Sequence, residues 1–199
     1  MGDKAQTMCH AYVGTTGTGK TTEVLKHVKR LGGKVLVIID NETVQGWDKI
    51  KAIPPTKKAL GFKTGVRKIL FDDYGAEEVW GNIHKFFRNG NIIMDDAAMY
   101  VEPNWNHNKA LKKVVIQHRH ISVDIFVIVH QFNDLPPKMW GYIKFLFIGK
   151  LTSIPKKSDI KVANPKALIS AAQTFNRAAA EAERKGQSVL GKFYCYKNF

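Results

Sequence analysis

Hydrophobic residues along the chain fall into short continuous runs, separated by longer segments with helical spacing. The short runs are bounded by glycine or by polar residues, which is typical of strands buried in a parallel sheet. We therefore expect strands at residues 7–13, 34–40, 66–71, 91–96, 123–129, 143–148 and 188–196.

In the segments between these runs, apolar residues recur every three or four positions, which predicts helices. Gly32 follows the first predicted helix, and Asn164 and Pro165 begin the last one, as the usual stop and start signals do. A short helix or turn is expected after the prolines at 136–137. The helices are predicted at residues 22–31, 76–88, 109–120 and 164–185.

Strands that alternate with helices predict an α/β fold, in which a doubly wound, mainly parallel sheet is flanked by helices. The length of 199 residues suits one domain, 1–199, with a full-sized core. We expect the core to span about 7–150, with 151–199 as a C-terminal extension that contains a helix and a strand.

The segment between the first predicted strand and the first predicted helix has the pattern G-x-x-x-x-G-K-[ST]. Such a loop points its N–H groups at a phosphate, while Lys20 reaches the β- and γ-phosphates and the Thr21 hydroxyl ligates Mg²⁺. Its place at a helix N-terminus favours anion binding over a plain surface loop. The pattern predicts ATP and Mg²⁺ as cofactors. The predicted binding residues are Gly14, Thr15, Thr16, Gly17, Thr18, Gly19, Lys20, Thr21 and Thr22.

Polar residues at the ends of two other predicted strands complete a candidate site. Asp95 and Asp96 follow a buried strand, as in a Walker B motif, where Asp95 would hold Mg²⁺ through water and Asp96 would orient or deprotonate the attacking water. The second acid is more often glutamate. Gln131 follows the strand at 123–129, at the sheet edge where ligands bind, and would contact the γ-phosphate or the water.

The charge of the chain indicates a polyanionic partner. There are 31 Lys and Arg residues against 17 Asp and Glu, a net charge of +14, and we favour nucleic acid over a merely lysine-rich surface. The sequence has no long apolar run and no signal peptide, which predicts a soluble intracellular protein. Cys9 and Cys195 fall in predicted strands and are expected to be buried, reduced thiols.

Three segments together resemble the FtsK/HerA superfamily of DNA-pumping ATPases, which have the RecA-like (ASCE) P-loop NTPase fold. They are the phosphate loop at 14–21, Ile-Ile-Met-Asp-Asp-Ala at 92–97, and Arg-His-Ile-Ser-Val-Asp-Ile-Phe-Val-Ile-Val-His-Gln at 119–131. The sequence is most similar to viral genome-packaging ATPases of tailless viruses with an internal membrane, and to zonula occludens toxin-like phage proteins. The toxin-like branch usually has a transmembrane segment, so its absence favours the packaging branch.

The resemblance implies an ATP-hydrolysing translocase that moves DNA without regard to sequence. It implies a homo-oligomeric ring, expected to be a hexamer, in the host cytoplasm or on the virion, with capsid or membrane vertex proteins as further partners. Gln131 would be the sensor, and Arg119 the arginine finger for a neighbour's γ-phosphate, with Arg88 and Arg67 as alternatives. Tyr100 and Trp105 would either face a central pore or pack on the domain.

Three other functions stay open. A toxin-like phage assembly ATPase would share the same motifs. A nucleotide or small-molecule kinase would lack the second acid and the strand-end glutamine, and would act as a monomer. A non-catalytic adaptor is supported by one observation, the aspartate at position 96 where glutamate is usual. ATP turnover stimulated by a polynucleotide would separate these functions.

Overall fold

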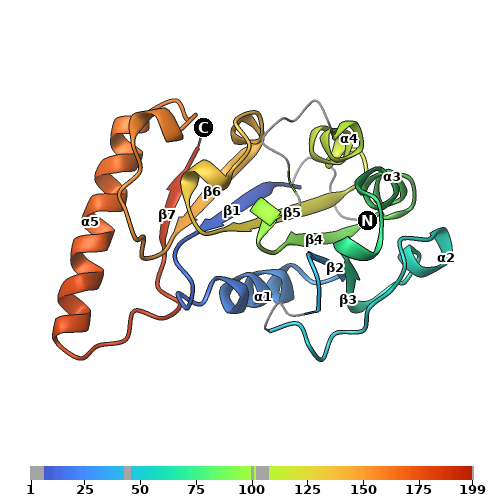
Figure 1. Ribbon diagram of the computed structural model, residues 1–199, viewed down its shortest axis with the longest axis horizontal. Helices are drawn as coiled ribbons and strands as arrows, with labels where there is room; N and C mark the ends of the chain where they lie inside the picture. The colour runs from blue at the N-terminus through green and yellow to red at the C-terminus, as the bar shows by residue number, and fades with distance from the viewer. Residues whose placement is uncertain (1–6, 43–45, 100, 102–107, 199) are drawn as a thin grey trace.

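The computed structural model describes residues 7–42, 46–99, 101 and 108–198. Within them the chain forms a seven-stranded sheet in the order β3-β2-β4-β5-β1-β6-β7 (Figure 1). All neighbouring strands are parallel except β7, which is antiparallel to β6. The strands are β1 Cys9–Val13, β2 Lys34–Ile39, β3 Gly65–Leu70, β4 Gly90–Met94, β5 Val123–Val129, β6 Ile143–Ile148 and β7 Tyr194–Lys197. The predicted α/β fold with a mainly parallel sheet is confirmed.

Helices cover both faces of this sheet. Alternate residues of β1 point to opposite faces, so that Tyr12 packs with α1 whereas Ala11 and Val13 belong to the larger cluster beneath α3 and α4. Figure 1 shows α1 on one side of the sheet, α3 and α4 on the other, and α5 beyond β7. The helices are α1 Lys20–Leu31, α2 Lys57–Leu60, α3 Ala76–Phe86, α4 Lys109–Gln117 and α5 Pro165–Arg184.

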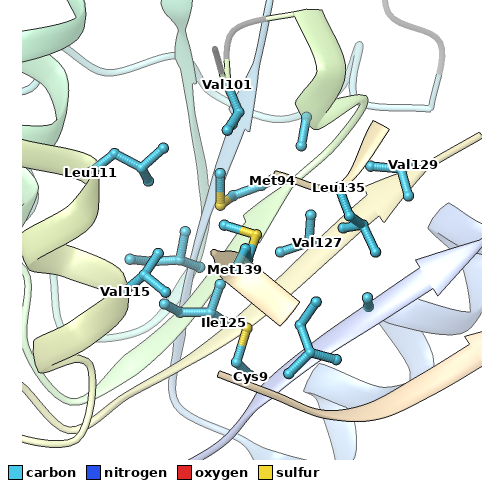
Figure 2. Packing of buried hydrophobic residues seen from close by; sticks show 14 of the residues in the cluster. Cys9, Met94, Val101, Leu111, Val115, Ile125, Val127, Val129, Leu135 and Met139 are labelled. Carbon is cyan, nitrogen blue, oxygen red and sulfur yellow. The ribbon is translucent and has the colours of Figure 1, made fainter. Parts of the chain in front are cut away.

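The larger apolar cluster ties the central strands to α4. Figure 2 shows Ile125 and Val127 of β5 beside Met94 of β4 and Met139, with Val115 of α4 close by. These five side chains are at most 1% exposed, and burying each contributes about 1.5–3 kcal/mol. Because β1, β4 and β5 are parallel neighbours fixed by this core, the residues that follow them are held at one edge of the sheet.

A histidine of β1 packs among aromatic side chains on the α1 side of the sheet. His10 of β1 is opposite Phe126 of β5 and Phe145 of β6 in the strand register. Its ring is stacked on both, with centroid distances of 4.7 Å and 5.6 Å. His10 is only 6% exposed, so this histidine takes the place of an aromatic core residue.

Besides shifts of one to three residues in the bounds of most elements, the structure differs from the sequence-based prediction in three places. The short helix α2 was not expected; its N-cap is Thr56, whose hydroxyl accepts a hydrogen bond from the Ala59 N–H. The last strand begins at Tyr194 rather than at 188, and 188–193 follow a different path. The prediction that Cys195 is buried is wrong, because β7 is an edge strand and leaves this free thiol exposed; Cys9 is buried and free, as predicted.

In the part of the chain that the structure describes, no helix combines the length and the apolar character needed to cross a membrane.

Candidate functional site

The phosphate loop leaves β1 at Val13 and enters α1 at Lys20. Gly19 is the N-cap of α1 with φ of 85°, and a Cβ atom there would lie 3.0 Å from the Gly191 nitrogen. A side chain at this position is therefore excluded both by backbone conformation and by space. Because the N-cap of α1 is a glycine, it offers no side chain to the first N–H groups of the helix, and these groups can bind an anion.

The Lys20 ammonium lies inside this loop. It donates hydrogen bonds to the carbonyl oxygens of Gly14, at 2.5 Å, and Thr15, at 2.9 Å. Lys20 as a whole is only 6% exposed. Burial lowers the pKa of Lys20, and the carboxylates of Asp95 and Asp96 oppose this shift. A desolvated cation enclosed by backbone is suited to bind a phosphate oxygen.

Thr21 and Asp95 meet directly beside the loop. The Thr21 hydroxyl donates to Asp95 Oδ2 at 3.2 Å, and the indole N–H of Trp47 donates to the same oxygen at 2.5 Å. Burial raises the pKa of Asp95, while these two hydrogen bonds and the charge of Lys20 lower it. A hydroxyl and a carboxylate at this spacing fit Mg²⁺, which prefers few protein oxygens together with phosphate and water.

Asp96 and the phosphate loop are linked by His130. The Asp96 backbone has φ of 50°, an uncommon conformation for a residue with a side chain. Its carboxylate lies 3.6 Å from His130 Nε2, and His130 Nδ1 lies 3.5 Å from the Thr16 hydroxyl. Both contacts are at the long end for polar interactions, so they orient the groups without fixing them rigidly.

Sequence reasoning missed Trp47 and His130. Trp47 is fully buried in a stretch without periodicity, and nothing local indicates that its indole reaches a strand end 48 residues away. His130 was inside the motif at 119–131, directly before Gln131, and a signal was available there, because a histidine at a strand end beside two acids can contact them.

The predicted residues at the ends of β1, β4 and β5 come to one edge of the sheet. Gln131 lies there, exposed, and its backbone N–H donates to Asp134 Oδ2 at 2.8 Å. Arg119 lies at the other end of β5, exposed, in the turn that follows α4. The two alternatives to Arg119 contact their own backbone: Arg88 donates to the His84 carbonyl and Arg67 to the Val66 carbonyl. Tyr100 and Trp105 lie outside the described residues.

No protein-family model and no curated protein matches the sequence, but solved structures match the fold. The genome packaging NTPase B204 of Sulfolobus turreted icosahedral virus 2, in complex with sulfate, is 14% identical with a TM-score of 0.65, over 96% of this chain and 91% of that one. The same NTPase in complex with ATP-gammaS gives 14% identity and a TM-score of 0.60, over 97% of each chain.

B204 from Sulfolobus turreted icosahedral virus, a DNA-packaging ATPase, is 13% identical with a TM-score of 0.60, and the match covers 100% of both chains. These likenesses confirm the predicted P-loop NTPase fold and its resemblance to viral packaging ATPases in architecture. The motif resemblance was expected to cover about 7–150, whereas the likeness in fold also includes the C-terminal residues.

Proposed function

We propose that this chain is an ATP-hydrolysing DNA translocase that packages a viral genome. The observation that carries the proposal is the meeting of Lys20, Thr21 and Asp95, with the Thr21 hydroxyl 3.2 Å from the Asp95 carboxylate. Phosphate-loop ATPases need this ammonium for the phosphates, and this hydroxyl and carboxylate for the ion. The likeness in fold to a genome packaging NTPase supports the packaging role.

Each residue of the site has a proposed task. Lys20 and the N–H groups of residues 14–22 bind the phosphates, and Thr21 and Asp95 hold Mg²⁺, which when bound neutralises charge on the phosphate oxygens. Asp96 orients or deprotonates the attacking water, and Gln131 contacts that water or the γ-phosphate. His130 lies between the Asp96 carboxylate and the loop and orients that carboxylate only loosely.

DNA and a second subunit complete the proposal. A net charge of +14 supports binding to DNA phosphates irrespective of sequence. The seven residues of β5 separate Arg119 from Gln131 by roughly 23 Å, too far for one nucleotide, so Arg119 would serve a neighbour's γ-phosphate. We therefore propose a homo-oligomeric ring, a hexamer, that acts in the host cytoplasm or on the virion with capsid or membrane vertex proteins.

ATP turnover tests this function directly. The rate is measured without polynucleotide, with single-stranded DNA and with double-stranded DNA, and the mass is determined with a nucleotide analogue present. We expect DNA-stimulated hydrolysis, assembly into a ring, and loss of hydrolysis with retained fold in Lys20→Ala, because the ammonium stabilises transition-state charge. Phosphate transfer to a nucleotide acceptor by a monomer would identify a kinase instead, and binding without turnover would identify an adaptor.

A further inference from the structure

The segment between α5 and β7, residues 186–193, touches the phosphate loop. We call it the C-terminal strap. The Gly191 N–H donates to the Thr18 carbonyl oxygen at 2.9 Å. In Figure 1 the strap runs from the end of α5 to the start of α1 before the chain enters β7. A carbonyl of the loop is thus held by a residue more than 170 positions later in the sequence.

The strap packs against two glycines, one at the end of the loop and one directly after β6. A Cβ atom on Gly19 would lie 3.0 Å from the Gly191 nitrogen and 3.2 Å from Leu190 Cδ1. A Cβ atom on Gly149, which follows β6, would lie 2.8 Å from the Phe193 ring. A side chain at either glycine would collide with the strap, so the strap lies directly against the end of the loop and the residue after β6.

The backbone beneath the loop is fixed to α5. The Lys150 carbonyl accepts a hydrogen bond from the Thr15 N–H at 2.8 Å. Lys150 also forms an ion pair with Glu183 of α5 at 2.7 Å. The Asn176 side chain of α5 accepts from the Leu151 N–H at 2.8 Å and donates to the Leu151 carbonyl at 2.9 Å. The loop is therefore connected to α5 both through the strap and through residues 150–151.

We infer that the C-terminal strap is a positioning element that holds the phosphate loop ready for anions and couples the loop to α5. The inference rests on the proposed nucleotide binding at this loop. Pre-arranged N–H groups bind an anion without a cost of ordering, so loosening the strap weakens binding of the phosphates. Coupling between two parts of a molecule is reciprocal, so bound phosphates also stabilise the strap.

Two glycines of the strap provide a matched pair of variants. Gly191 has φ of 72° and Gly186 has φ of 71°, so valine causes similar backbone strain at both positions. A Cβ atom at Gly191 would lie 3.2 Å from Glu23 Oε1 of α1, whereas one at Gly186 meets nothing within 4 Å. Strain at Gly191 acts on the residue whose N–H is bonded to Thr18, so Gly191→Val disturbs the contact with the loop, whereas Gly186→Val places similar strain outside that contact.

The test measures binding of ATP and of inorganic tripolyphosphate to the full chain, with melting temperatures in parallel. We expect Gly191→Val to lower the affinity for both ligands by the same factor, about tenfold, relative to Gly186→Val. We also expect tripolyphosphate to slow amide hydrogen exchange in the strap of the wild type. Equal affinities in the two variants would overturn the inference, as would weakened ATP binding with unchanged tripolyphosphate binding, which would show a contact with the base.

If Gly191→Val does not fold, Phe193→Ala decides, with the exposed neighbour Tyr194→Ala as control. Phe193→Ala should weaken tripolyphosphate binding, and Phe193→Tyr should restore it because the ring on Gly149 is kept. Wild-type affinity in Phe193→Ala would overturn the inference but leave the proposed function standing. A wild-type chain that binds neither ATP nor tripolyphosphate would overturn the proposed function and the inference with it.

Discussion

Replacement of His10 by phenylalanine should make the fold resistant to mild acid. The buried His10 Nδ1 has no hydrogen-bond partner among the described residues. The imidazole is stacked between Phe126 and Phe145, so a phenyl ring suits the same place without a buried polar atom. Removing an unsatisfied nitrogen from a core is itself favourable, by about 1–3 kcal/mol, at any pH at which the histidine is neutral.

The pH-dependent part follows from the pKa. Burial, together with the charges of His27 and His118, lowers the pKa of His10 to about 3. In the unfolded chain the pKa of histidine is about 6.5, so between these values the unfolded state binds a proton that the folded state does not. The contribution of the neutral His10 to the free energy of unfolding is therefore complete above pH 6.5 and is lost as the pH falls towards 3. At about 1.4 kcal/mol per pH unit, acidification to about pH 4 costs the wild type about 3 kcal/mol through this group.

The assay is urea unfolding of the wild type and of His10→Phe between about pH 8 and pH 4. The difference in unfolding free energy should widen by about 3 kcal/mol across this range, since phenylalanine has no proton to bind. The exposed His120, replaced by glutamine, is the control and should follow the wild type. Parallel stability curves for His10→Phe and the wild type would refute the reasoning.

Four further predictions concern the candidate site. Asp96→Asn should bind ATP but lose turnover, because the variant has no carboxylate to act as a base on the attacking water. Asp95→Asn should also weaken Mg²⁺-dependent binding, because it removes a negative charge at the ion. Wild-type turnover in Asp96→Asn would show that another residue orients or deprotonates the attacking water. Trp47→Phe removes a hydrogen bond to a carboxylate and should weaken Mg²⁺-dependent ATP binding about tenfold in an Mg²⁺ titration; an unchanged titration would contradict a role in positioning Asp95. DNA affinity should fall steeply with salt and be the same for unrelated sequences, and a chain without affinity at low salt would point to another polyanion. Mixtures of Arg119→Ala and Lys20→Ala subunits should regain part of the lost ATPase activity if Arg119 acts on a neighbour; inactive mixtures in which mixed rings form would leave Arg88 or Arg67 as the finger.

The elements that the sequence predicts well are those with a local signal. The phosphate loop is a contiguous pattern, and Asp95 and Asp96 directly follow an apolar run, so their place at the sheet edge follows from parallel strands alone. The contact of Trp47 with Asp95 and the path of the strap depend on residues far apart in sequence. No periodicity in either segment encodes such a contact, and packing in three dimensions determines it.

The errors have the same origin. Residues 188–196 contain enough strand-forming residues to predict a strand, but Gly191 has φ of 72° and its N–H is bonded to Thr18, outside the sheet. Cys195 has the hydrophobic character of a core residue, but exposure depends on whether a further strand or helix covers β7. A single sequence shows that a strand exists more readily than it shows its position in the sheet.

The strand order has a consequence for synthesis of the protein. β1 is made first, yet it lies between β5 and β6, which begin at residues 123 and 143. A nascent chain that has not reached β6 would expose an unpaired edge of β1, and such edges associate with other chains. Because Gly191 holds Thr18, the loop that follows β1 is completed only after the residues beyond β6 and α5 have been translated. We expect the fold to form slowly, and only late in synthesis, because so many of its contacts join distant parts of the chain.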